Sequence, residues 1–194
     1  MKKVLTIGVM GPGKNATESE ILLAERVGRI IAKKGHYTLT GGSNTGVMNA
    51  ALKGAKDFDP DARTIAILSN NGEVEKTSQY ADVCIPTGMG EGRNYMNIRS
   101  CDIIVFCCDD LFKSTGTLSE FAFAVKHEKC IIIIHKKDGL RTRPIRSKWN
   151  YILTSIFGAK KYIANNIGIT FDIEDFEKYL DMFIDKIYIE NIKI

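Results

Sequence analysis

The sequence lacks features that define several large protein classes. No apolar run reaches the roughly 20 residues of a membrane-spanning helix. None of the five cysteines forms a C-x-x-C pair, and the three histidines show no ligand spacing with them. We therefore expect no metal site, and buried reduced thiols in a cytoplasmic protein.

Net charge is also small, at +4 at pH 7, so it does not by itself imply nucleic acid, and we expect neither nucleic acid nor membrane as a partner. The charge is uneven. Eight basic residues and one acid lie between Lys136 and Lys161, whereas seven acids and three lysines follow from Asp172 onward. We interpret both segments as solvated surface; the alternative is a loop that meets an anionic ligand or the acidic helix of a second subunit.

The start of the chain, MKKVLTIGVMG, is basic and then apolar, like a signal peptide. Its apolar part is short, however, and no small-residue cleavage site follows, so we interpret it as a buried first strand. Repeats, low-complexity tracts and a linker are not apparent. With 194 residues, 44% of them apolar, one globular domain over 1–194 is expected.

Strand-like and helical patterns alternate along the chain. The predicted strands are 3–10, 36–40, 64–68, 83–86, 102–108 and 130–135, and the predicted helices are 16–34, 47–56, 93–100, 117–127 and 172–188. Thr17-x-x-Glu20 has the pattern of a capping box at the start of the helix 16–34, and Gly35 is expected to end that helix. The segment 151–170 is ambiguous. This alternation predicts an α/β fold, with a mostly parallel sheet and helices on both faces.

Three glycine-rich turns each follow a predicted strand and precede a helix. They are GPGKN (Gly11–Asn15), TGGSNTGVM (Thr40–Met48) and KSTGTLSE (Lys113–Glu120). In such a sheet, ligands bind beyond the carboxyl ends of the strands. Glycine lets backbone N–H groups approach a guest, and a helix start carries partial positive charge. Together the turns predict a site for an anion, most simply a phosphate.

A nucleotide triphosphatase loop is a less favoured alternative. Gly8–Lys14 has the spacing G-x-x-x-x-G-K, and the apolar run before Asp109 resembles the second half of such a site. Asn15, however, stands where a hydroxyl should hold magnesium. A dinucleotide fingerprint also has the wrong glycine spacing.

Three segments resemble one superfamily: GGSNTGVMNAALKGA (Gly41–Ala55), GEGRNYMNIRSCDIIVF (Gly90–Phe106) and TGTLSEFAFA (Thr115–Ala124). It contains the Lonely Guy phosphoribohydrolases, long mislabelled lysine decarboxylases, and the molybdenum cofactor carrier proteins. The resemblance implies a Rossmann-like fold and a homodimer or homotetramer. Lysine decarboxylation is not expected, because no Schiff-base lysine pattern is present.

The enzymes of this superfamily cleave the N-glycosidic bond of nucleoside 5′-monophosphates, without a cofactor for catalysis. Their pattern, P-G-G-x-G-T-x-x-E after an arginine, is matched here by Gly116, Thr117, Glu120 and Arg93. The resemblance implies that Glu120 holds the ribose hydroxyls and the attacking water. Arg93 would stabilise the charge of an oxocarbenium-like state.

The chain departs from the enzymes at two places. Phe112, Lys113 and Ser114 replace P-G-G, and Arg93-Asn94 replaces part of a Glu-Arg-Lys run. The Arg-Asn version is more similar to the carrier branch. We therefore expect a protein that binds a phosphorylated nucleotide- or pterin-like molecule, a nucleoside monophosphate or the molybdenum cofactor, with the phosphoribohydrolase as the alternative. The candidate binding residues are Gly11, Gly13, Gly41, Gly42, Ser43, Gly46, Val47, Met48, Arg93, Asn94, Lys113, Ser114, Thr115, Gly116, Thr117 and Glu120.

Overall fold

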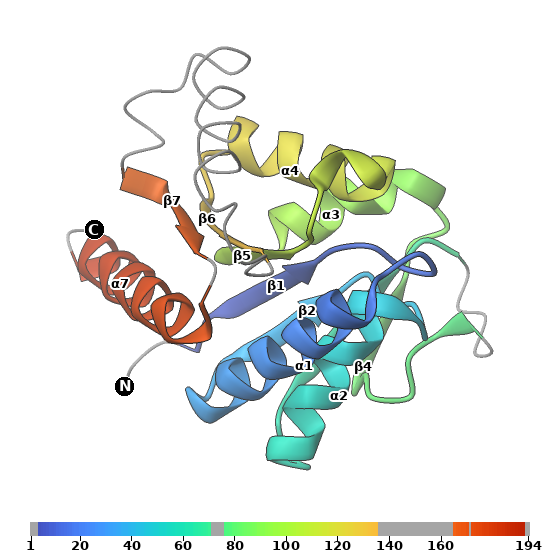
Figure 1. The fold of residues 1–194 in the computed structure, drawn as a ribbon, viewed down its shortest axis with the longest axis horizontal. Helices are drawn as coiled ribbons and strands as arrows, with labels where there is room; N and C mark the ends of the chain where they lie inside the picture. Colours follow the sequence, from blue (N-terminus) through green and yellow to red (C-terminus); the bar gives the residue numbers. More distant parts are fainter. Residues whose placement is uncertain (1–3, 71–75, 136–164, 171, 193–194) are drawn as a thin grey trace.

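Parallel strands form a seven-stranded sheet in the computed structural model, which describes residues 4–70, 76–135, 165–170 and 172–192 (Figure 1). The strand order is β4-β3-β2-β1-β5-β6-β7. The fold confirms the predicted α/β class. The strands are β1 (Thr6–Met10), β2 (Tyr37–Thr40), β3 (Thr64–Leu68), β4 (Val83–Pro86), β5 (Ile103–Cys107), β6 (Cys130–Ile134) and β7 (Ile167–Thr170).

Helices cover both faces of this sheet (Figure 1). On one face α1 (Glu18–Lys33), α2 (Gly46–Phe58) and α7 (Ile173–Ile192) pack onto a single apolar cluster. On the other face α3 (Arg93–Arg99) and α4 (Thr115–Lys126) pack onto a second cluster. Two short 3-10 helices, η2 (Gly90–Gly92) and η3 (Leu111–Lys113), precede α3 and α4. Within the described ranges, no helix combines the length and the apolarity needed to cross a membrane.

The predicted signals at the ends of α1 are confirmed. The Thr17 side chain accepts a hydrogen bond from the backbone of Glu20, whose own side chain accepts one from the backbone of Thr17. Gly35 follows the helix at φ +74°, a conformation that costs glycine little. The capping box determines where the loop after β1 ends and α1 begins, and Gly35 marks where α1 ends.

Two sequence expectations differ from the structure. Strand β7 lies in the segment that the pattern left ambiguous, and its four residues pair with β6. Helix α4 begins at Thr115 rather than Thr117, because Ser114 caps it. Glu120 therefore lies in the second turn, beyond the stabilising field of the helix start. The basic segment 136–161 lies outside the described residues.

The strand order places a crossover between β1 and β5. From β1 the chain adds β2, β3 and β4 on one side, then returns to add β5, β6 and β7 on the other. The loops after β1 and β5 consequently turn to opposite faces of the sheet and leave a crevice between them. This crevice is where a ligand of such a sheet is expected.

Candidate functional site

A cavity of about 480 Å³ occupies this crevice. Its lining comes from the loop after β1, the start of α1, the loop after β5 and the start of α4. The lining residues are Pro12, Gly13, Lys14, Asn15, Thr17, Glu20, Asp109, Lys113, Ser114 and Thr115. The volume lies within the range of about 300–1,000 Å³ that is typical of small-molecule sites.

One wall of the cavity is suited to an anion. It consists of Lys14, Lys113 and the start of α4, whose first turn contains no acidic residue. Ser114 Oγ accepts hydrogen bonds from the backbone N–H of Thr117 (3.3 Å) and from its hydroxyl (3.0 Å). The N–H groups of the first helical residues have no acceptor within the helix, so they can bind a phosphate.

The second wall carries two carboxylates. Glu20, which is buried, accepts from the backbone N–H groups of Thr17 (2.8 Å) and Asp109 (2.8 Å). Asp109 Oδ2 in turn accepts from the hydroxyls of Thr17 and Ser19, each at 3.2 Å. This network attaches the loop after β5 to the start of α1 and holds both carboxylates in place.

The turn that carries the G-x-x-x-x-G-K spacing is separated from the helix start. Lys14 and Asn15 lie in a turn, and α1 begins only at Glu18. The capping box uses the backbone N–H groups of Thr17 and Glu20, and Glu18 and Glu20 make the first turn of α1 acidic. An acidic helix start is unfavourable for a bound triphosphate.

The first two glycine-rich turns lie side by side. Gly46 has φ +64°, and a Cβ there would come within 2.1 Å of the Gly13 carbonyl oxygen. The Val47 N–H donates to the Pro12 carbonyl at 3.0 Å. A Cβ at Gly11 would meet the Val47 side chain at 2.8 Å. These predicted residues therefore shape the wall behind Gly13 rather than line the cavity.

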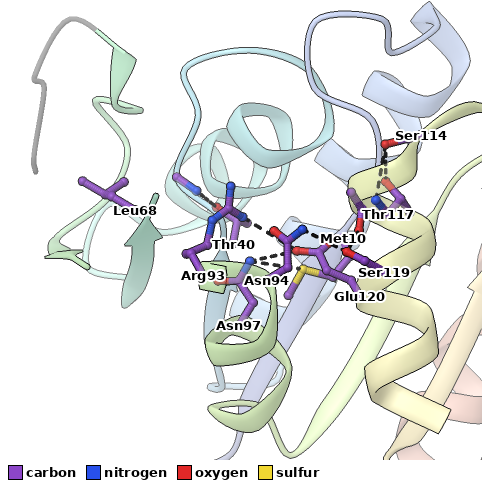
Figure 2. Close-up of polar contacts among 12 residues, drawn as sticks. Met10, Thr40, Leu68, Arg93, Asn94, Asn97, Ser114, Thr117, Ser119 and Glu120 are labelled. Carbon is purple, nitrogen blue, oxygen red and sulfur yellow. Dashed lines mark hydrogen bonds and ion pairs between the residues drawn. The ribbon is translucent and has the colours of Figure 1, made fainter. Parts of the chain in front are cut away.

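A second polar cluster lies beside α3 and α4, at the same edge of the sheet (Figure 2). Arg93 Nη1 lies 3.7 Å from Glu120 Oε1, and Asn97 Nδ2 donates to the same oxygen at 2.9 Å. Gly41 makes room for the guanidinium, since a Cβ there would lie 1.9 Å from Arg93 Nη1. The structure thus brings together the arginine and the glutamate that the motif paired.

Burial dominates the electrostatics of this cluster. It raises the pKa of Glu120 to about 7, although the hydrogen bond from Asn97 and the charge of Arg93 act in the opposite direction. Burial also lowers the pKa of Arg93, an effect that Glu120 partly offsets. The Glu120 carboxyl therefore exchanges a proton near neutral pH, as a general acid or base requires.

The remaining predicted residues have mixed positions. Gly13, Lys113, Ser114 and Thr115 line the cavity. Asn94 Nδ2 donates to Ser119 Oγ at 3.0 Å, which joins α3 to α4 close to Gly116. The rest belong to neither the cavity lining nor the polar cluster of Arg93 and Glu120. Met48 lies between Gly13 and Gly41, and Thr117 is buried. Gly42 faces β3, and Ser43 forms a β-bridge with Thr77.

Sequence reasoning missed several lining residues. Glu20 and Asp109 are 89 positions apart, and their hydrogen bond exists only because β1 and β5 are neighbours. The first glycine-rich turn contains Lys14 and Asn15, and the capping box contains Thr17, but neither motif indicated that these side chains line a cavity. Asn97 carried no signal at all. Within the described residues, no group of three or more His, Cys, Asp or Glu side chains could hold a metal ion.

Comparison with known proteins gives matches over most of the chain. The model of the SLOG cluster4 family matches residues 4–161. A molybdenum cofactor binding protein from the phototrophic bacterium Rippkaea orientalis is 32% identical, with 97% of this chain and 99% of that one covered and a TM-score of 0.73. The molybdenum cofactor carrier protein of Chlamydomonas reinhardtii is 28% identical, with coverages of 94% and 99% and a TM-score of 0.74.

Two further similarities are less informative about function. An uncharacterized protein of Archaeoglobus fulgidus is 37% identical over 127 residues, which cover 66% of this chain and 78% of the relative. DNA processing protein A from Helicobacter pylori has a TM-score of 0.58 at 20% identity, over 91% of this chain and 80% of that one. At this low identity the likeness concerns the fold alone.

Proposed function

The chain belongs to the SLOG cluster4 family, and we propose that it carries the molybdenum cofactor, a phosphorylated pterin-type molecule, in the cavity between β1 and β5. One observation carries the proposal. A chain with 32% identity over nearly its whole length binds the molybdenum cofactor, and the cavity here has an anion-binding wall at the expected crevice.

The phosphate of such a ligand fits the wall formed by Lys113, Ser114 and Thr115. The amides at the start of α4 supply hydrogen bonds, and the helix start supplies partial positive charge. Lys14 and Lys113 add full charges. Within the part of the chain that the structure describes, the side-chain amine of neither lysine has an ion-pair or hydrogen-bonding partner that competes with a ligand.

Carriage without reaction agrees with the lining. Arg93 and Glu120, the pair that resembles an enzymatic one, are absent from the residues that line the cavity. The carboxylate of Glu20, which does line it, is engaged in hydrogen bonds that hold two loops together. The ligand would therefore meet groups that bind and orient it.

Retention of the cofactor tests this proposal. We expect the purified protein to keep the molybdenum cofactor through anaerobic gel filtration, and Lys14→Ala/Lys113→Ala to weaken binding by roughly tenfold or more. Bound pterin is measured by the fluorescence of its oxidised derivative. Lys126→Ala, in the last turn of α4, is the matched control and should bind like the wild type. A wild-type protein that retains no pterin would contradict the proposal.

A phosphoribohydrolase is the second candidate, because Glu120 is buried beside Arg93 with its pKa raised to about 7. The same preparation distinguishes the two. Free base released from AMP, and lost in Glu120→Gln, would favour the enzyme over the carrier.

We also propose that the protein works as a homodimer or homotetramer in the cytoplasm. Val83 and Ile85 of β4, and Met89 shortly after it, are exposed apolar side chains that a second copy would cover. Tyr95 and Met96 of α3 are also exposed. The five cysteines are unpaired, which agrees with a reducing compartment.

A further inference from the structure

The cavity has two chemically different walls. Lys14, Lys113 and the start of α4 offer cations and N–H donors, whereas Glu20 and Asp109 offer acceptors. A ligand that filled both walls would be anionic at one end and rich in N–H donors at the other. A phosphate accounts for the lysines and the start of α4 only. The rest of the ligand should therefore be complementary to Glu20 and Asp109.

The network around Asp109 makes that wall a preorganised acceptor. The nearby donors point at the carboxylates: the backbone N–H groups of Thr17 and Asp109 at Glu20, and the hydroxyls of Thr17 and Ser19 at Asp109. Both hydroxyls donate to Oδ2 of Asp109, so these contacts orient the carboxylate, which lines the cavity. A guest that reaches this wall meets lone pairs and negative charge.

We infer that Asp109 is a specificity-determining residue that selects a ring with a 2-amino-4-oxopyrimidine edge. This edge, which pterins and guanine share, has two adjacent N–H donors that a carboxylate can accept together. Adenine has an acceptor nitrogen beside its amino group, and that nitrogen would face the carboxylate. The inference rests on the proposed function, because it assumes that the phosphate occupies the α4 wall of the same cavity.

Three nucleotides that differ only at this edge test the inference. GMP has the complete edge, IMP lacks the 2-amino group, and AMP lacks both adjacent donors. We expect GMP to bind the wild type roughly tenfold to a hundredfold more tightly than IMP, because one hydrogen bond to a charged group is lost, and AMP to bind more weakly still. The dissociation constants are measured by calorimetry, and 6-hydroxymethylpterin phosphate is the pterin arm.

Variants separate the ring from the phosphate. Asp109→Asn should remove the preference for GMP over IMP while phosphate-driven binding persists. Asp110→Asn is the matched control: it lies on the same loop outside the cavity, where its side chain accepts from Phe112 N, and it should keep the wild-type ratio. Lys113→Ala should weaken all three nucleotides equally.

The outcomes distinguish this inference from the proposed function. Equal wild-type affinities for GMP, IMP and AMP would overturn the role of Asp109, even if the molybdenum cofactor is retained. A preference for GMP that survives in Asp109→Asn would overturn it as well. If that variant fails to fold, the wild-type ratios alone decide. If the protein retains no cofactor but strongly prefers GMP, the carrier function is refuted and the ring selectivity stands. If the pterin phosphate binds more tightly than GMP, the ring that Asp109 selects is a pterin.

Discussion

At the scale of single residues, Glu120 shows how burial competes with a nearby opposite charge. Its side chain has an arginine at 3.7 Å and a hydrogen bond from Asn97, and both favour the ionised form. The residue is nevertheless only 5% exposed, and the loss of water outweighs both contacts, so its pKa rises to about 7. The motif identified this residue and its partner; the burial that sets its chemistry came from the packing of α3 on α4.

The raised pKa of Glu120 predicts a pH-dependent stability. The folded protein holds a proton on this carboxyl between its ordinary pKa of 4.5 and about 7, where the unfolded chain does not. The free energy of unfolding should therefore fall as pH rises through this window, by at most about 3 kcal/mol from this group. Urea unfolding at pH 5, 6, 7 and 8 measures the slope.

Glu120→Gln should lose this contribution, because an amide does not titrate. The difference between wild type and variant isolates Glu120 from buried His135, whose lowered pKa works in the opposite direction. Glu91→Gln, at an exposed position near Arg93, should keep the wild-type slope. Identical pH profiles for wild type and Glu120→Gln would show that the carboxyl is not held protonated by the fold.

At the scale of elements, α1 and α2 are in unusually close contact. A Cβ at Gly28 would lie 1.9 Å from the Ala51 carbonyl oxygen, and a Cβ at Gly54 would lie 1.9 Å from that of Glu25. Each glycine thus lets the backbone of the other helix approach. Because α1 follows the turn Gly11–Asn15 and α2 follows Thr45, this contact also positions the first two glycine-rich turns side by side.

Gly28→Ala should destabilise the protein by about 1–3 kcal/mol, since overpacking outweighs the gain of about 1 kcal/mol in helix propensity. Thermal unfolding followed by circular dichroism measures the change. Arg29→Ala, at the next and exposed position of α1, should stay within about 0.5 kcal/mol of the wild type. A melting temperature that rises in Gly28→Ala would mean that the helices can move apart at no cost.

At the scale of the whole molecule, the two edges of the sheet differ. Strand β7 lies beside α7, whose Phe176, Leu180 and Phe183 are buried. All four residues of β4 are exposed, although parallel strands are normally covered on both faces. An uncovered apolar edge strand favours association, which is why we propose a homo-oligomer.

Ile85→Lys should therefore shift the protein toward monomer, because a charge at this edge cannot be buried without a partner. Native mass spectrometry and sedimentation measure the subunit number. Leu22→Lys is the matched control, since Leu22 is an exposed apolar residue on α1, away from β4. A monomeric wild type, or an Ile85→Lys variant that remains oligomeric, would refute this interface.

From the amino-acid sequence it was possible to predict the alternation of strands and helices, the caps of α1 and the pairing of Arg93 with Glu120. The strands, helices and caps follow from apolar periodicity and from hydrogen bonds between residues close in sequence, which can be read from the chain directly. The pairing of Arg93 with Glu120 followed from the order of the motifs. The same reasoning placed the start of α4 two residues late, because Ser114 was not identified as its cap.

The lining of the cavity could not be predicted without knowing how the strands pack. Strand order made β1 and β5 neighbours, and this adjacency joined Glu20 to Asp109 across 89 positions and brought two carboxylates and two lysines into the lining of one cavity. The structure also shows that Arg93 and Glu120 are not among the residues that line the cavity. It shows as well that β7 is a strand, because β6 offers it a partner. Such contacts depend on which elements pack together, and no local pattern encodes that choice.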